Sequence, residues 1–281
     1  MDAYWSLSIE LLPQHRAWLS ARLLELGFAA FEEQSRREST IIIIYHQSAE
    51  RLREVEAVLQ GGAARAWPNS ALCFSLGQPG VDWALLWTEH LRPVRLTPSL
   101  MLYPDASEVA PGPGRLCLLP AFAFGFGEHV TTRLMATWLE SRCRAHPGSS
   151  VLDVGCGTGV LALVACLSGA GRVLGVDISE PAVQASRANA ELNRLPAQFQ
   201  QGSAGGLSER FECVVANIEA AVLLAECAGI VGSLADTGEL ALAGFIEEQV
   251  PELLERYRGE GVELRHQARE GDWCLLVGRR S

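Results

Sequence analysis

The chain has 281 residues, enough for more than one domain, because single domains commonly have about 100–200 residues. Hydrophobic residues make up 48% of the sequence and charged residues 20%, a balance that excludes a largely disordered protein. The formal net charge of -10 disfavours direct binding to nucleic acid and favours a basic protein partner.

The eight cysteines are scattered without a C-x-x-C pair, and the six histidines form no cluster with the spacing of metal ligands. We therefore expect reduced thiols and no bound metal. The N-terminal residues include charged side chains and no apolar run of the length of a signal peptide or a membrane span. These features predict a soluble, cytoplasmic protein that does not bind membranes.

The first 77 residues alternate strand patterns with two amphipathic helical patterns. The predicted elements are a strand at 4–11, a helix at 13–26, strands at 28–33 and 40–45, a helix at 49–59 ended by Gly61 and Gly62, and a strand at 71–76. The order βαββαβ is that of a ferredoxin-like domain. Such a domain recognises a binding partner or serves as a spacer or dimerisation unit, and the residues leave both roles open.

Residues 78–98 are predicted to form a helical linker between this domain and a second one. Residues 81–91 have a helical pattern that carries Trp83 and Trp87 one turn apart, and Pro93 ends it. The two tryptophans would anchor one domain on the other or contact a partner. A role in a core or between the domains is the default interpretation.

The second domain is predicted to cover residues 99–281. Its first elements are strands at 100–103 and 115–119, a loop at 123–130 and a helix at 131–145. Gly125 and Gly127 would let the loop approach a ligand closely, and the start of the helix supplies unpaired N–H groups and the Thr132 hydroxyl. Thr131 and Thr132 would otherwise only cap the helix.

Residues 151–177 read as an apolar strand, a glycine turn, an apolar helix at 160–167 and a second apolar strand at 172–177, which together make a nucleotide-binding βαβ unit. Gly155, Gly157 and Gly159 allow a sharp turn and a close approach of the backbone to a ligand. Their G-x-G-x-G spacing differs from the G-x-G-x-x-G of dinucleotide-binding proteins. The alternative interpretation is a tight turn without a ligand.

Two acids accompany the glycines. Asp153, two residues before the first glycine, suits a cofactor that carries a cationic amino acid better than one that carries a pyrophosphate. Asp177, at the end of the second strand, is placed to accept hydrogen bonds from two ribose hydroxyls. The combination predicts S-adenosylmethionine as the cofactor.

Helices and strands continue to alternate up to the C-terminus. The predicted elements are a helix at 179–193, strands at 197–201 and 212–218, a helix at 218–230, a strand at 239–244, a helix at 248–257, and strands at 262–269 and 273–278. Asn217 ends one strand at the edge where open α/β sheets bind ligands. The last two strands form an antiparallel hairpin. The pattern predicts an α/β, Rossmann-like class I methyltransferase sheet with helices on both faces and a C-terminal antiparallel hairpin, preceded by the ferredoxin-like domain.

Over most of its length the chain resembles the ribosomal protein L11 methyltransferases, which modify amino groups of a protein of the large ribosomal subunit. The resemblance is carried by Ala123-Phe124-Gly125-x-Gly127-x-His129-x-Thr131-Thr132, Asp153-x-Gly155-Cys156-Gly157-x-Gly159, Gly175-Val176-Asp177-Ile178 and Val215-Ala216-Asn217-Ile218. The segments Trp87-x-Glu89-His90-x-x-Pro93 and Ala243-Gly244-Phe245-Ile246 are also similar. The glycine turn is common to methyltransferases, whereas the first and fourth motifs together are specific to this family.

The resemblance implies that Thr132, Gly155, Asp177 and Asn217 contact S-adenosylmethionine. The predicted cofactor-binding residues are Thr132, Asp153, Gly155, Gly157, Asp177, Ile178 and Asn217. The resemblance also implies that the first domain recognises ribosomal protein L11, a basic substrate, and that the linker lets the second domain reach several amino groups.

Methyl transfer to an amine is an in-line displacement that needs positioning and a free lone pair. We predict that Asn217 orients the amine and that His129 or Glu219 helps the proton to leave. The chain departs from the family at Phe126, at Glu128 and Val130 around the histidine, and at Glu219.

Phe126 and Glu219 leave open one alternative, methylation of another protein's lysine or of a small amine. A second alternative, from another class of protein, is a non-catalytic cofactor-binding adaptor. A nicotinamide-dependent dehydrogenase conflicts with the glycine spacing and the terminal hairpin.

Overall fold

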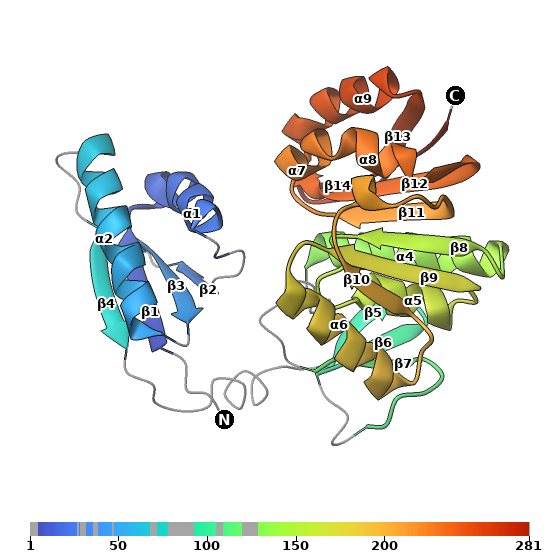
Figure 1. Ribbon diagram of the computed structural model, residues 1–281, viewed down its shortest axis with the longest axis horizontal. Coiled ribbons are helices and arrows are strands. Elements are labelled where there is room, and N and C mark those ends of the chain that lie inside the picture. The colour runs from blue at the N-terminus through green and yellow to red at the C-terminus, as the bar shows by residue number, and fades with distance from the viewer. Residues whose placement is uncertain are drawn as a thin grey trace. The chain divides into compact units, whose positions relative to one another are not determined.

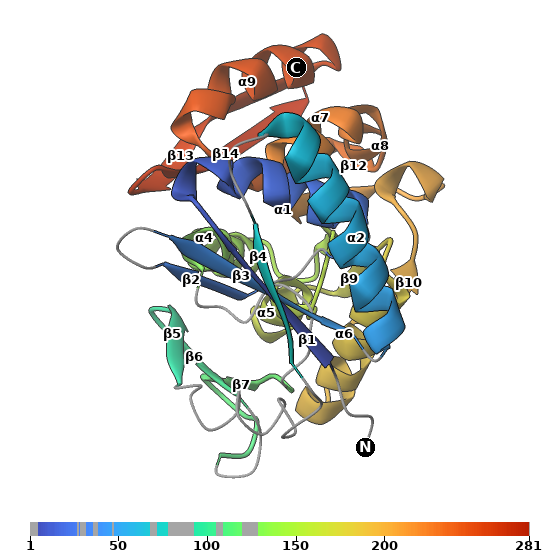
Figure 2. The same ribbon diagram turned by 90° about the vertical axis from the view of Figure 1, so that its left-hand side faces the viewer.

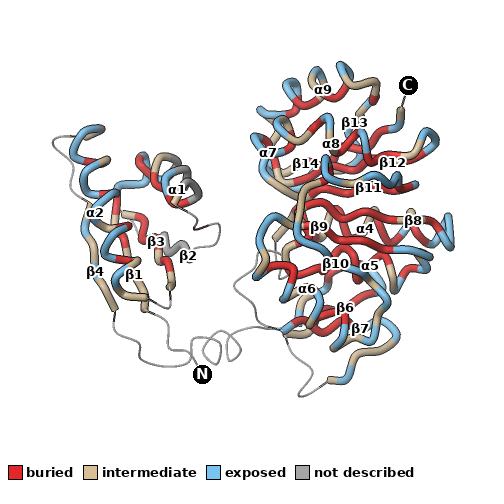
Figure 3. The backbone as a smooth tube through the Cα atoms, in the orientation of Figure 1, coloured by how far each residue is buried: buried red, intermediate tan, exposed pale blue. Residues whose placement is uncertain are grey.

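The computed structural model describes residues 5–26, 28, 32–35, 39–46, 48–67, 72–77, 93–104, 109–119 and 129–280. These residues group into two compact units, 1–90 and 91–281 (Figure 1). Each unit has its own sheet and its own buried core, as the red strands of Figure 3 show. In the described part of the chain no helix is both long enough and apolar enough to cross a membrane.

The first unit is a four-stranded antiparallel sheet with two helices (Figure 2). Its elements are β1 (Trp5–Leu11), the 3-10 turn η1 (Pro13–His15), α1 (Arg16–Glu25), β2 (Glu32–Ser35), β3 (Thr40–His46), α2 (Ala49–Ala66) and β4 (Cys73–Gly77). The strand order β2-β3-β1-β4 is that of a ferredoxin-like domain, as predicted.

One face of this sheet is apolar because alternate residues of its strands point to the same side. Leu7 pairs with Ile44 and Ile9 with Ile42, and all four side chains are buried. Residues of both helices belong to the same core, so α1 and α2 cover this face together.

The helix α2 is longer than predicted, because it continues through Gly61 and Gly62 to Ala66. Gly62 lies against the indole of Trp18, where a Cβ would come within 3.0 Å of the ring, and Ala63 is buried. Packing on α1 therefore outweighs the low helix propensity of glycine, which costs about 1 kcal/mol for each residue.

The predicted linker helix at 81–91, with Trp83 and Trp87, lies outside the described residues. Residues 94–97, which the sequence pattern assigns to that linker, form the strand β5 (Val94–Thr97) of the second unit. Leu96 and Thr97 are buried there. With β6 (Leu100–Tyr103) and β7 (Arg115–Cys117), β5 makes a small three-stranded sheet.

The second unit is built on a seven-stranded sheet of order β10-β9-β8-β11-β12-β14-β13. Its strands are β8 (Ser150–Val154), β9 (Arg172–Asp177), β10 (Gln198–Gln201), β11 (Phe211–Asn217), β12 (Leu234–Ile246), β13 (Val262–Glu270) and β14 (Trp273–Arg280). The first five are parallel, and β14 runs antiparallel to β12 and β13. The predicted methyltransferase sheet with its terminal hairpin is confirmed.

In the described part of the chain, helices cover both faces of this sheet. One face carries α4 (Val130–Ala145), α5 (Val160–Leu167) and α6 (Glu180–Asn193), and the other carries α7 (Ala220–Ala225), α8 (Cys227–Gly232) and α9 (Val250–Gly259). The chain passes from β8 outward to β10 and then returns to β11 on the other side of β8. The strand order therefore reverses beside β8, and such sheets bind ligands at the carboxyl ends of the strands at this point.

The helix predicted at 218–230 is divided into α7 and α8 at Glu226. The helix α8 packs on the 3-10 turn η2 (Ala204–Gly206), where Gly229 is so close to Gly205 that a Cβ would lie 2.7 Å from the Gly205 nitrogen. The bend brings α8 onto this turn, a tertiary contact that the helical pattern does not contain.

Candidate functional site

The glycine turn joins β8 to α5 in a backbone conformation that favours glycine. Gly155, Gly157 and Gly159 have φ angles of 70°, 53° and 80°, all in the left-handed region. A Cβ on Gly155 would overlap the Cγ2 of Ile218, and one on Gly159 would lie 2.9 Å from Phe199 and Ser186. The turn is therefore closely packed on its inner side, and neither Gly155 nor Gly159 has room for a side chain.

Asp177 is held beside this turn at the end of β9. Its Oδ2 accepts the N–H of Gly157 at 3.0 Å, and its Oδ1 accepts the N–H of Ser179 at 2.9 Å. The residue is half-buried. A carboxylate has about four acceptor positions, so each oxygen can accept a further hydroxyl while the backbone fixes its place.

Asp153 lies beneath the turn and is buried, with 1% of its surface exposed. Its Oδ2 accepts the N–H of Ala162 at 3.1 Å, and its Oδ1 has no partner among the described residues. Burial, opposed by the Ala162 N–H and reinforced by the charge of Asp177, raises the pKa of Asp153 to about 7. A cation near this carboxyl would be stabilised by its charge.

Asn217 and Thr132 bring together the end of β11 and the first turn of α4. The Nδ2 of Asn217 donates to the Thr132 hydroxyl at 3.3 Å, and Thr132 is fully buried. The Asn217 Oδ1 is buried without a partner among the described residues. Because the amide nitrogen is bound to Thr132, its oxygen is the atom left to accept a hydrogen bond from a ligand.

His129 is the N-cap of α4. Its Nδ1 accepts the N–H of Thr131 at 3.4 Å and lies 2.8 Å from the Thr131 hydroxyl. The ring packs edge-on against Trp273 with centroids 4.6 Å apart. Burial, with the nearby charge of Arg133, lowers the pKa of His129. These contacts fit a capping role; a role as a base stays a prediction.

Ile178 and Glu219 lie on the surface at the same edge of the sheet. Ile178, directly after Asp177, is 78% exposed, which is unusual for a large apolar side chain and leaves it open to a flat ligand ring. Glu219 is exposed at the N-cap of α7, two residues after Asn217, and its side chain makes no capping bond. Phe126 and Glu128 lie outside the described residues.

Two further residues, Gly244 and Asn189, shape the site, although the sequence patterns predict no role for either. Gly244 has φ 98°, and a Cβ on it would overlap the carbonyl oxygen of Ile218. Ile218 therefore lies between Gly155 and Gly244, which both must be small. The motif around Gly244 is part of the family resemblance, and that was the only signal for it.

Asn189 is the second such residue and is fully buried on α6. Its Nδ2 donates to the Thr158 carbonyl at 2.9 Å, and its Oδ1 accepts the N–H of Leu119 at 2.8 Å. It thus joins the glycine turn to the chain just before residues 120–128. The available signal was a polar residue on the stripe of α6 that also carries the buried Val183 and Ser186.

The sequence of this chain is similar to those of a known protein family. The family model described as ribosomal protein L11 methyltransferase (PrmA) matches residues 17–281. The ribosomal protein L11 methyltransferase of Dechloromonas aromatica is 34% identical over 242 residues, which are 85% of this chain and 79% of that protein. That of Vibrio campbellii is 38% identical over 205 residues, 71% of this chain and 68% of that protein.

Among solved structures, the ribosomal protein L11 methylase from Lactobacillus delbrueckii subsp. bulgaricus has a TM-score of 0.62 and 28% identity, and the match covers 68% of this chain and 100% of that one.

Proposed function

Since the chain belongs to the ribosomal protein L11 methyltransferase family, we propose that it transfers methyl groups from S-adenosylmethionine to amino groups of ribosomal protein L11. One observation carries the assignment of the site. The glycine turn, the carboxylate of Asp177 and the Asn217–Thr132 pair meet where β8, β9 and β11 end. The carboxyl ends of the strands are the place at which an open α/β sheet binds its ligand.

The residues fit the cofactor. S-adenosylmethionine supplies an electrophilic methyl group on a sulfonium centre. In our proposal Asp177 accepts the ribose hydroxyls and the exposed Ile178 packs on the adenine ring. Asp153 supplies negative charge near the cationic methionine end, which Gly155, Gly157 and the first turn of α4 at Thr132 surround. The unpartnered Asp153 oxygen and the close-packed glycine turn support this arrangement.

Asn217 positions the substrate amine in this proposal. Its Oδ1 accepts an amine N–H, while the bond to Thr132 holds the amide in one orientation. A lysine amine has a pKa of about 10.4 in water, and removing it from water favours the neutral form that carries a free lone pair. The main contribution is then alignment of the amine.

Two residues are candidates for assisting the loss of a proton from the substrate amine. The exposed Glu219 carboxylate is close in sequence to Asn217 and would attract an ammonium group before it loses its proton. The ring of His129 contacts Thr131 in the first turn of α4. We therefore propose that His129 mainly positions α4 and that proton transfer is its secondary role.

The first unit is proposed to recognise L11, with residues 78–98 as the connection to the methyl-transfer unit. The negative net charge suits a basic ribosomal protein and disfavours contacts with ribosomal RNA. We propose that the reaction takes place in the cytoplasm, on L11 as a protein substrate.

The function is tested by incubating the enzyme with labelled S-adenosylmethionine and the separated proteins of large subunits from cells that lack the enzyme. We expect label in L11 alone, in an acid-stable form bound to amino groups. The exposed Glu219 favours the one alternative, another protein amine as acceptor. Label in a different ribosomal protein with none in L11 would support that alternative and contradict the proposal.

A further inference from the structure

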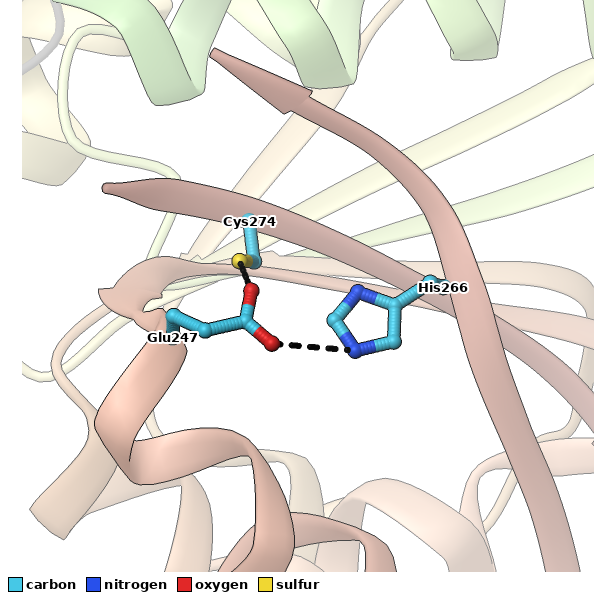
Figure 4. A group of neighbouring side chains, drawn as sticks. All are labelled: Glu247, His266 and Cys274. Atoms are coloured by element: carbon cyan, nitrogen blue, oxygen red, sulfur yellow. Dashed lines mark hydrogen bonds and ion pairs between the residues drawn. The ribbon is translucent and has the colours of Figure 1, made fainter. Parts of the chain in front are cut away.

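Three side chains that commonly bind metal ions meet on one face of the second unit (Figure 4). They are Glu247, which begins the 3-10 turn η3 (Glu247–Gln249) after β12, His266 on β13 and Cys274 on β14. The Cys274 sulfur lies 3.0 Å from the Glu247 Oε2, and the His266 Nε2 lies 3.6 Å from its Oε1. All three ligand atoms are within 4.8 Å of one another.

A β-bulge places His266 on this face. Cys274 and Leu276 are two residues apart on β14, so their side chains point to the same side of the sheet. Leu276 pairs with His266 because β13 contains one extra residue, Gln267, at this point. Without the bulge, Gln267 would pair with Leu276 and His266 would point to the opposite face, since a shift of one residue reverses every side chain.

The carboxylate of Glu247 is held in place from outside the group. The backbone N–H of Glu247 donates to the carbonyl of Asp272 at 3.0 Å. The Arg269 Nη1 lies 3.3 Å from the Glu247 Oε2, and its Nε donates to the carbonyl of Gly271 at 2.8 Å. A carboxylate that binds a metal is commonly fixed by such an outer donor.

We propose that Glu247, His266 and Cys274 form a binding site for zinc, with one thiolate, one imidazole and one carboxylate as ligands. Zinc prefers sulfur and nitrogen ligands at about 2.0–2.3 Å, distances that small side-chain rotations bring within reach of all three atoms. Cys274 is fully buried, whereas the side chains of His266 and Glu247 are 46% and 40% exposed. Water therefore has access to the fourth position.

Binding exchanges a proton for the ion. Without metal, burial and the hydrogen bond to Glu247 raise the pKa of the Cys274 thiol to about 11, so the sulfur is protonated at neutral pH. Zinc would displace that proton to solvent and lie between the sulfur and the carboxylate. The ion would then connect the end of β12 to the β13–β14 hairpin, whose Trp273 contacts the N-cap of α4.

The test uses the full chain without an affinity tag, freed of metal and kept reduced. Titration with Co2+ should give one equivalent per chain with an absorption band of cobalt–thiolate charge transfer, and Zn2+ should remove that band. Cys274→Ser and His266→Ala should each abolish the band and weaken zinc binding by at least about 100-fold. Loss of a residue that only hydrogen-bonds a metal ligand weakens metal binding by about 10- to 100-fold.

Matched controls are Cys73→Ser and His146→Ala, because Cys73 and His146 are both exposed and lie outside the group. Both controls should bind the metal like the unaltered chain. Zinc should also raise the melting temperature of the unaltered chain and leave that of His266→Ala unchanged, which separates metal binding from a folding defect. Equal zinc affinity in Cys274→Ser, or a cobalt complex without the thiolate band, would overturn the proposal.

Discussion

At the scale of single residues, the site depends on how closely Ile218 approaches two glycines, with its side chain against Gly155 and its backbone against Gly244. Gly155 and Gly244 both adopt positive φ angles, and a Cβ on either would overlap Ile218. Asn217, which is proposed to hold the substrate amine, directly precedes Ile218. The glycines therefore set the position of a proposed catalytic residue as well as the path of the turn.

Gly155→Ala should lower the free energy of unfolding and weaken cofactor binding. The matched control is Gly148→Ala, because Gly148 also has a positive φ, 82°, and a Cβ on it would meet nothing within 4 Å. Both variants bear the left-handed strain of about 1–2 kcal/mol, and only Gly155→Ala adds overpacking of about 1–3 kcal/mol. Urea unfolding measures the difference, and equal losses in both variants would contradict the close contact with Ile218.

Asp153 makes stability depend on pH. Its pKa is raised from 3.8 to about 7 in the folded chain, so the folded state binds a proton that the unfolded state has already lost. Stability should therefore fall as pH rises from 4 to 7, by up to about 1.4 kcal/mol per pH unit, and change no further from this group above 7.

Urea unfolding of the cofactor-free chain and of Asp153→Asn across this range isolates the effect, since the remaining groups titrate in both proteins. The stability of Asp153→Asn relative to the unaltered chain should rise with pH. A difference that is constant with pH would show that Asp153 is ionised normally.

At the scale of elements, α6 holds two segments of the site together. Asn189 joins the glycine turn at Thr158 to Leu119, and Asn193 exchanges hydrogen bonds with the backbone of Cys117 on β7. The helix thus links the cofactor turn to the small sheet β5–β6–β7.

Asn189→Leu should remove both bonds and leave the carbonyl of the buried Thr158 without its partner, at about 1–3 kcal/mol. We expect lower stability in urea unfolding and weaker binding of S-adenosylmethionine in calorimetry. Gln184→Ala on the same helix is the control, because Gln184 is exposed and its side chain bonds Glu180 at the start of that helix. If Asn189→Leu is as stable as Gln184→Ala, the proposed link through Asn189 between the glycine turn and Leu119 is ruled out.

The elements that were predicted with the right bounds are those for which local signals agree. The pattern at 160–167 and 172–177 matches α5 and β9, since apolar periodicity and flanking glycines indicate the same ends. Where tertiary packing decides, the prediction was wrong. The helix α2 continues through two glycines on Trp18, and the helix at 218–230 divides at Glu226.

Some residues of the site could be predicted from the sequence, and others could not. Asp153 and Asp177 have a fixed spacing from the glycines, so the motif alone points to them. The bonds of Asn189 connect residues 31 and 70 positions away, which no local pattern encodes. The grouping of Glu247, His266 and Cys274 depends on a bulge in the register of two strands, and their spacing along the chain does not resemble a metal motif.

At the scale of the whole molecule, the chain combines two compact units with separate cores, and we assign substrate recognition to one and methyl transfer to the other. A chain without residues 1–77 should bind S-adenosylmethionine with the affinity of the full chain in calorimetry, because the proposed cofactor residues lie in the second unit. It should no longer methylate L11. Normal methylation by the shortened chain would contradict a recognition role for the first unit.

The central claim is that methyl groups reach L11 from a cofactor tethered at Asp177. The most direct test is the intact mass of purified L11 after incubation with S-adenosylmethionine and either the unaltered chain or Asp177→Ala, at a cofactor concentration near the dissociation constant. The unaltered chain should add whole methyl increments. Asp177→Ala should add few, because losing a hydrogen bond to a charged group costs about 1.5–3 kcal/mol of cofactor binding. L11 of unchanged mass with the unaltered chain, or equal methylation by both proteins, would contradict the account.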